Sequence, residues 1–221
     1  CGPEFRVQGV PGDDAFGRDA QGALYGRKLE EMLFKLMAEA IGKLEPATVS
    51  RSFARCGFAM NRRISTPGGF TLGLNPDGPV DHDVPLLRVE SPDGKTLRAV
   101  AFGYACHNTT LSFFQWHGDY AGCAQAELER RHRGATVMFA IGCGADINPG
   151  PRRELTYAEQ HGRDLADAAD RALAKPQHLV MGSFRSAFED ITLTFSRRPT
   201  DARLREAKEK DQPNKEMHQA W

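Results

Sequence analysis

The chain has 221 residues, of which 40% are hydrophobic and 26% charged, the ordinary composition of a soluble globular protein with room for one large domain or two small ones. Twenty-nine lysines and arginines balance 29 aspartates and glutamates, so the formal charge is zero, which argues against nucleic acid or an anionic membrane as a partner. No apolar run approaches the roughly 20 residues of a transmembrane helix.

The cysteines give no sign of a disulfide framework. The five of them are odd in number and include no CxxC pair, which also argues against a zinc ribbon. We expect free, buried thiols. The five are Cys1, Cys56, Cys106, Cys123 and Cys143.

The first third of the chain predicts a helix, a strand and a long loop. Residues 1–19 are typical of a loop. Apolar residues recur at spacings of three and four from Leu24 to Leu44, which predicts an amphipathic helix that Pro46 ends. Residues 47–60 are rich in valine, phenylalanine and small residues and predict a strand. Residues 64–83 contain several Pro-Gly and Asn-Pro signals and predict a long, functional loop.

The middle of the chain predicts a hairpin followed by a helix and a strand. Val84–Glu90 and Leu97–Ala105 are expected to pair around the turn Pro92-Asp93-Gly94. Asp119 is expected to cap the N-terminus of a helix that runs to about His132. Ala135–Ile141 is a continuous apolar run, which favours an interior strand.

The last third predicts a helix, a strand and an exposed helix. Residues 156–174 have helical spacing and are followed by Pro176. Met181–Phe195 favours one strand or two, and residues 200–211 favour a charged helix. One hairpin combined with strand–helix units predicts an α/β fold, a mixed β-sheet flanked by helices.

Two polar loops follow apolar strands, at 105–110 and 142–149, and open α/β sheets usually bind ligands at the carboxyl ends of strands. His107, in the first loop, is suited to be a metal ligand or a base. Alternatively, it is a buried histidine that a backbone carbonyl satisfies. His117 and Asp119 form either a base with its orienting carboxylate, or a surface histidine beside a helix cap.

The loop at 142–149 contains small residues, so its backbone can come close to a ligand. Asp146 and Asn148 project polar groups from it. The alternative is a tight strand-to-helix connection with capping side chains. Arg152 and Arg153, just beyond, are surface charges unless they face the same pocket.

Arg62 lies beside Asn61 near the end of a predicted strand. A guanidinium group is always charged and binds a carboxylate or an oxyanion through a fixed fork of donors. The alternative is a solvated arginine, and Arg63 is expected to be the exposed member of the pair.

Four motifs in this order resemble the catalytic domain of the neutral/alkaline non-lysosomal ceramidases, in particular a bacterial ceramidase-like branch. The resemblance covers nearly all of the chain, to about Arg198. The motifs are Asn61-Arg62-Arg63, Phe102–Leu111, Gly118–Gly122 and Gly142–Pro149.

The resemblance implies a zinc-dependent amidase that hydrolyses the N-acyl bond of ceramide. His107 matches a zinc-binding histidine, and Arg62 matches an arginine that holds the substrate or the oxyanion. The stretch 145–149 matches the family's Gly-Asp-Val-Ser-Pro, which assigns catalytic roles to Asp146 and Asn148.

The same resemblance also implies residues that bind the substrate. Gly118-Asp119 matches the family's Gly-Asp motif before a helix. Asn61, His117 and Asp119 are accordingly expected to bind the substrate. A lipid or other small-molecule substrate and a secreted or periplasmic location are also implied.

One departure from the family pattern concerns the chemistry. Asn148 stands where the family has a serine proposed as catalytic, and an amide is not a nucleophile. A mechanism in which zinc activates a water molecule does not need the serine, and Asn148 can still donate a hydrogen bond to an oxyanion. The alternatives are a metal hydrolase of another substrate, or a binding domain that has kept the fold without the catalysis.

The other departure concerns zinc. Cys1-Gly2-Pro3 matches the end of the family's His-Thr-His-Ser-Gly-Pro motif. We therefore expect residues 1–221 to be a partial ceramidase-like catalytic domain, truncated at both ends, with further zinc ligands on either side. Such a segment is expected to bind zinc poorly and to be inactive alone. Its oligomeric state is not indicated.

Overall fold

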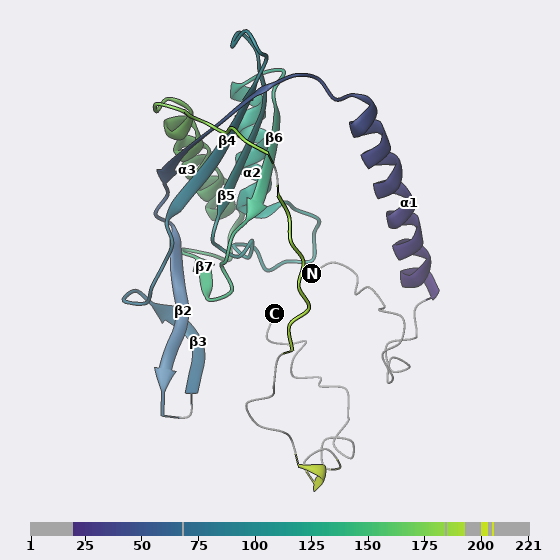
Figure 1. The fold of residues 1–221 in the computed structure, drawn as a ribbon. Helices are drawn as coiled ribbons and strands as arrows, with labels where there is room; N and C mark the ends of the chain where they lie inside the picture. Colours follow the sequence, from purple (N-terminus) through teal and green to yellow (C-terminus); the bar gives the residue numbers. More distant parts are fainter. Residues whose placement is uncertain (1–19, 68, 184, 193–199, 203–204, 206–221) are drawn as a thin grey trace. The chain divides into compact units, whose positions relative to one another are not determined.

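The computed structural model describes residues 20–67, 69–183, 185–192, 200–202 and 205 (Figure 1). The chain divides into two compact units, Cys1–Ala47 and Thr48–Trp221. In the first unit, α1 (Ala20–Gly42) carries the repeated apolar spacing, which confirms the first predicted helix. All the remaining elements belong to the second unit.

A five-stranded mixed sheet forms the body of the second unit, in the order β6-β5-β4-β1-β8. Strands β5 and β6 are parallel, and the other neighbours are antiparallel. The predicted α/β class with a mixed sheet is confirmed, as is the predicted hairpin, which is β4–β5. The strands are β1 (Thr48–Arg55), β4 (Asp83–Glu90), β5 (Leu97–Tyr104), β6 (Thr136–Ile141) and β8 (His178–Leu179).

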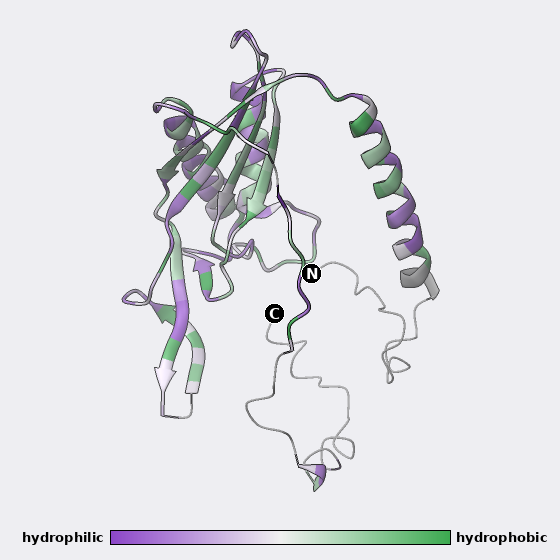
Figure 2. Cartoon of the chain, in the orientation of Figure 1, coloured by the Kyte–Doolittle hydropathy of each residue, from purple (hydrophilic) through white to green (hydrophobic). Residues whose placement is uncertain are grey.

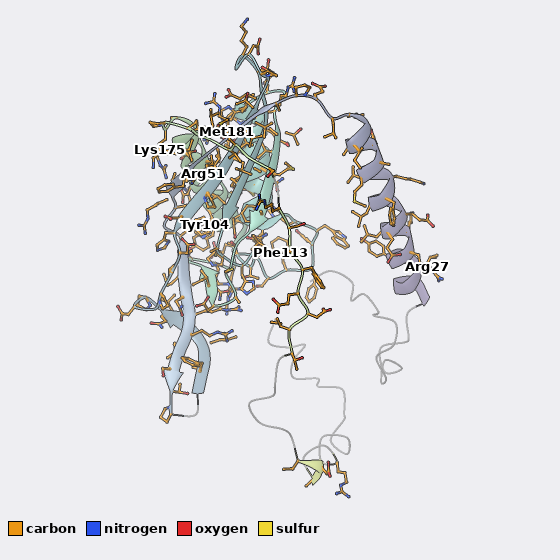
Figure 3. The ribbon with its side chains drawn as sticks, viewed as in Figure 1. Arg27, Arg51, Tyr104, Phe113, Lys175 and Met181 are labelled. Atoms are coloured by element: carbon orange, nitrogen blue, oxygen red, sulfur yellow. The ribbon has the colours of Figure 1, made fainter. Side chains whose placement is uncertain are left out.

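Two helices, α2 (Asp119–Arg131) and α3 (Leu155–Leu173), pack against each other and against this sheet. Small residues let them approach closely: a Cβ added at Gly162 would lie 2.3 Å from Cys123 Cβ. The core between helices and sheet contains large, fully buried side chains, each worth about 1.5–3 kcal/mol of burial free energy. Among them are Val84, Leu86, Val100, Phe102, Tyr104, Tyr120, Leu128 and Leu165. Figure 3 marks Tyr104 inside this packed body.

Only alternate residues of these strands reach the core. In β1, for example, Ser52 and Ala54 are buried while Phe53 is 54% exposed. Hydrophobic and hydrophilic residues are accordingly mixed along the strands (Figure 2). The prediction that Ala135–Ile141 is an interior strand is wrong, because β6 lies at the edge of the sheet and Met138 is 51% exposed. Apolar composition alone does not distinguish an edge strand from a central one.

A second, three-stranded antiparallel sheet has the order β3-β2-β7. It consists of β2 (Ala59–Thr66), β3 (Gly69–Asn75) and β7 (Ile147–Pro149). The predicted single strand at 47–60 is therefore two strands, β1 and the start of β2. The predicted loop at 64–83 is wrong, because it contains the end of β2 and all of β3, which pair as a hairpin. The outer half of this hairpin is exposed, so no buried face imposes the alternation by which a strand is recognised.

The end of the chain differs from the prediction. Residues 181–183 and 185–192 contain no strand, and the segment pairs with β1 earlier, through Leu179 opposite Ser50. The predicted loop at 1–19 and most of the predicted helix at 200–211 lie outside the described residues. Within the described residues, no helix combines the length and the apolarity that crossing a bilayer requires.

Candidate functional site

The two polar loops predicted as a site lie backbone to backbone. Because β5 and β6 are parallel neighbours, with Tyr104 opposite Ile141, their carboxyl ends meet at one edge. Gly142 N donates to Tyr104 O at 3.0 Å. A Cβ added at Gly144 would lie only 2.6 Å from Cys106 N, so this position requires glycine.

Strand β7 joins this edge to the second sheet. Asn148 lies opposite Met60, and Arg62 N donates to Asp146 O at 2.8 Å. His107 N donates to Ile147 O at 3.2 Å. Three segments that are far apart in the sequence are thereby held together by backbone hydrogen bonds.

Arg62 is the centre of the resulting site. Its Nη2 donates to Ala145 O at 2.8 Å and lies 2.9 Å from His107 Nε2, and its Nη1 donates to Asn148 Oδ1 at 3.2 Å. The structure therefore brings together three of the predicted site residues, Arg62, His107 and Asn148. None of the three acceptors is a carboxylate.

The contact with Arg62 fixes the state of His107. A guanidinium group only donates, so His107 Nε2 must accept and carry no proton. Burial lowers the pKa of His107, and the positive charge of Arg62 lowers it further. His107 is therefore a neutral imidazole at neutral pH.

The same contact orients Asn148. Its Oδ1 accepts from Arg62 Nη1 and, at 3.4 Å, from Thr109 Oγ1. Its Nδ2 group is consequently turned away from both donors and makes no hydrogen bond within the described residues. Asn148 thus keeps a free N–H donor on the side of its amide that faces away from Arg62 and Thr109.

Hydrogen bonds of Asn61 and Asp146 hold together the segments that carry the site. Asn61 is 3% exposed, and its Nδ2 donates to Asp146 Oδ2 at 3.2 Å and to Pro79 O at 3.0 Å. Its Oδ1 accepts from Arg63 N at 2.8 Å. The Asn61 side chain is therefore fully engaged in holding the protein together.

His117 and Asp119 do not form a carboxylate–imidazole pair. Asp119 is buried, and its carboxylate accepts from Leu111 N at 2.9 Å and from Tyr120 N at 2.7 Å. His117 is exposed, and its Nδ1 accepts from Asp119 N. The predicted cap at Asp119 is wrong by one residue, because Gly118 occupies the N-cap and Asp119 is the first helical residue.

Arg152 is a charged residue that the sequence favoured as a surface charge, unless it faces the pocket of the site loop. It is half-buried, and its buried Nε has no partner within the described residues. Both flanking residues are fixed: His161 Nε2 lies 2.7 Å from Pro151 O, and Arg153 N donates to Thr110 O at 2.5 Å. The one available signal was its place directly after the site loop.

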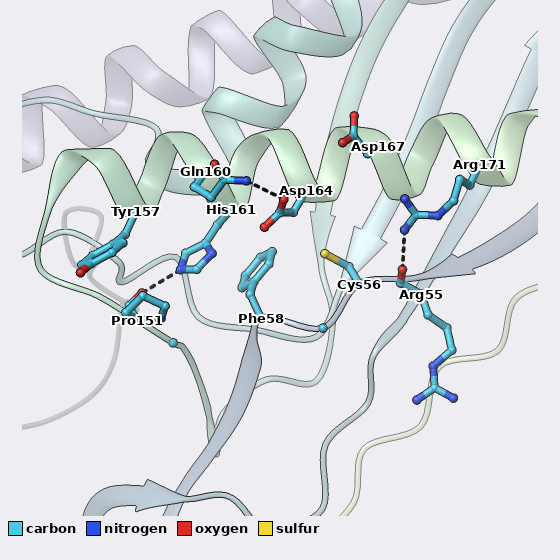
Figure 4. A pocket seen from close by; sticks show the side chains of 12 residues that line it. Arg55, Cys56, Phe58, Pro151, Tyr157, Gln160, His161, Asp164, Asp167 and Arg171 are labelled. Carbon is cyan, nitrogen blue, oxygen red and sulfur yellow. Dashed lines mark hydrogen bonds between the residues drawn. The ribbon is translucent and has the colours of Figure 1, made fainter.

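His161 holds this segment from α3. Its ring stacks on Phe58 with centroids 4.4 Å apart, and the Pro151 contact is visible in Figure 4. A pocket of about 560 Å³ opens beside it, lined among others by Cys56, Tyr157 and Asp164. Nothing in its helical sequence context distinguishes His161 from an ordinary core residue.

The described residues do not by themselves form a zinc site. A catalytic zinc ion takes about three protein ligands. No group of three or more histidine, cysteine, aspartate or glutamate side chains is gathered for a metal within the described part of the chain. The described cysteines are all free thiols, as expected, and Cys56 and Cys106 are buried. The expected burial is wrong for Cys143, which is exposed, and Cys123 is only half-buried.

Known proteins resemble this chain in structure rather than in sequence. No family model and no curated protein matches the sequence. Among solved structures, a ceramidase complexed with C2 matches with a TM-score of 0.53 and 18% identity, over 65% of this chain and 25% of that one. Neutral ceramidase from Pseudomonas aeruginosa matches with a TM-score of 0.54 and 18% identity, over 66% and 26%.

The chain therefore has a ceramidase-like α/β fold and spans about a quarter of the length of the structures it matches. This likeness agrees with the family resemblance of the four sequence motifs.

Proposed function

We propose that this chain belongs to a ceramidase-like hydrolase that cleaves the N-acyl amide bond of a ceramide-like lipid, with zinc as its cofactor. The observation that most supports this proposal is the contact of Arg62 with both His107 and Asn148, at the edge where two parallel strands end. The ceramidase-like fold supports the same class of reaction.

The residues of the site suit the charge that amide hydrolysis creates. The carbonyl oxygen becomes negative as the amide is attacked, and fixed N–H donors stabilise it. Arg62 supplies a permanent positive charge, and Asn148, whose Oδ1 accepts from Arg62, keeps a free Nδ2 donor. His107 is a neutral imidazole, the form that binds metals, but its Nε2 lone pair accepts from Arg62 Nη2 in this structure, so Arg62 would have to release it for zinc to bind there. His107 is the one described residue that we assign to zinc, so the remaining ligands must come from elsewhere.

A binding domain without catalysis is the second candidate. It is favoured by Asn148, whose amide cannot replace a nucleophilic serine. A secreted or periplasmic location remains a prediction from the family resemblance.

Fatty-acid release separates the two candidates. The natural gene product, loaded with zinc, is incubated with ceramide and with simpler N-acyl amides, and released fatty acid is measured by mass spectrometry. Asn148→Ala should lower kcat by about 10²–10³-fold, the usual loss for one oxyanion donor. Asn108→Ala, at an exposed asparagine of the neighbouring loop, should keep the native rate.

Asn148→Ser tests the role of the amide further, because it restores the residue that the family carries. Substantial activity in native protein and in this variant means that position 148 acts through hydrogen bonding. If no amide releases fatty acid even with zinc bound, the hydrolase proposal fails and the binding domain replaces it.

A further inference from the structure

The contact with Arg62 leaves His107 without a nitrogen that can bind a metal ion. Arg62 Nη2 lies 2.9 Å from His107 Nε2, and a guanidinium group keeps its protons and only donates. The Nε2 lone pair is therefore taken by an Arg62 N–H. A neutral imidazole then carries its single proton on Nδ1, which has no lone pair left for a metal. The contact and metal ligation exclude each other at both ring nitrogens.

Arg62 does not depend on His107 for its position. Its Nη2 also donates to Ala145 O at 2.8 Å, and its Nη1 donates to Asn148 Oδ1 at 3.2 Å. Its backbone is fixed by the hydrogen bond from Arg62 N to Asp146 O at 2.8 Å. Because Nη2 carries two hydrogens, the loss of His107 as an acceptor frees one N–H while the other stays on Ala145 O. The freed donor remains at the site.

The charge of Arg62 opposes a metal ion at His107 in addition to the hydrogen bond. A guanidinium group is permanently charged, and none of the three acceptors of the Arg62 side chain is a carboxylate that would offset this charge. Two cations a few ångströms apart repel each other. Both effects favour either Arg62 or a metal ion at His107 Nε2, and not the two together.

We propose that Arg62 and zinc compete for His107, so that metal loading converts Arg62 from a cap on the imidazole into a free donor for the carbonyl oxygen of the substrate. The inference rests on the zinc role of His107 in the proposed function, and it adds an order in which the metal binds before the donor becomes available. Such coupling is reciprocal: the Arg62 contact weakens zinc binding, and zinc weakens the contact by the same factor.

The zinc affinity of the natural gene product, titrated against a chromogenic chelator, tests the competition. Arg62→Met removes the donor from His107 Nε2 and should tighten zinc binding by at least about tenfold, which corresponds to about 1.4 kcal/mol. Arg63→Met removes the same charge from an exposed neighbour and should change the affinity by less than about threefold, because exposed charges are screened by solvent.

A measurement on the native sequence does not depend on how well a variant folds. Nitrogen NMR of the histidine rings reports which ring nitrogen carries the proton, and His107→Ala identifies the signal of His107 by its loss. In metal-stripped protein at neutral pH, the proton of His107 should lie on Nδ1. A ring protonated on Nε2 would show that Arg62 does not donate there, and the proposal would be wrong.

Failure of the competition is distinguishable from failure of the proposed function. If His107→Ala weakens zinc binding while Arg62→Met tightens it no more than Arg63→Met does, the competition is overturned and the zinc role of His107 stands. If His107→Ala leaves zinc binding unchanged, the zinc role in the proposed function is overturned as well. Tighter zinc binding by Arg62→Met alone, in a protein that hydrolyses no amide, supports the competition and overturns the hydrolase.

Discussion

At the residue scale, the site depends on groups that accept and donate in only one way. Arg62 can only donate, so it forces His107 Nε2 and Asn148 Oδ1 to be acceptors. No competing tautomer of His107 or flipped Asn148 amide satisfies the same contacts. One cation therefore sets the hydrogen-bonding state of two neighbours.

Asn61 gives a prediction at this scale. Asn61→Ala removes the three hydrogen bonds of a buried amide and leaves Pro79 O and Arg63 N without this partner. The free energy of unfolding should fall by about 1–3 kcal/mol, the usual cost of unsatisfied buried polar groups. Urea denaturation followed by circular dichroism measures it.

The control for Asn61 is Asn108→Ala, whose exposed side chain should change the free energy of unfolding by less than about 0.5 kcal/mol. Similar losses in both variants would show that the Asn61 amide does not brace the protein.

At the scale of elements, charges bind α2 to α3. Arg131 Nη1 lies 2.7 Å from Asp167 Oδ1 and 2.6 Å from Asp170 Oδ2 on α3, and Arg131 Nε lies 2.8 Å from Glu127 Oε1. His132 adds a contact of 2.6 Å to Asp170. These ion pairs supplement the apolar helix–helix packing.

Replacing Arg131 tests this link. Arg131→Gln should destabilise the protein by about 1 kcal/mol, because its contacts are partly exposed. Arg130→Gln is the control, since Arg130 is 67% exposed and, within the described residues, forms an ion pair with Glu127 alone, on its own helix. Equal effects of the two substitutions in urea denaturation would contradict a link between the helices.

The same network predicts a dependence on pH. Hydrogen bonds from Arg130 and Arg131 lower the pKa of Glu127 from 4.5 to about 2. A carboxylate whose pKa is lowered by folding stabilises the protein above its unfolded pKa, and this contribution is lost as the pH falls. The stability difference between native protein and Arg131→Gln should therefore shrink between pH 4.5 and about 2.

At the scale of the whole molecule, regular patterns were predictable and pairings were not. The helices at α1, α2 and α3 and the β4–β5 hairpin follow from periodicity and turn residues. The edge position of β6 and the exposed β2–β3 hairpin do not, because nothing in a local pattern states which strands are neighbours. The same limit applied to the site, where the type of residue at 62, 107 and 148 indicated chemistry while the half-buried position of Arg152 depended only on its surroundings.

The zinc ligands give a prediction for the chain as a whole. With His107 as the one assigned ligand, the 221-residue chain should bind zinc more weakly than micromolar. Titration against a chromogenic chelator measures this affinity, with His107→Ala as the comparison. One ion bound per chain at micromolar or tighter affinity would show that the chain completes a zinc site by itself.

The close approach of Gly144 to the Cys106 backbone has a consequence for how such a site can diversify. The spacing between the loops is set by main-chain atoms, so exchanging a side chain such as Asn148 need not move the frame that carries it. New substrate preferences can therefore arise by single substitutions at projecting positions. Changes at the glycines would instead separate the loops and abolish every preference at once.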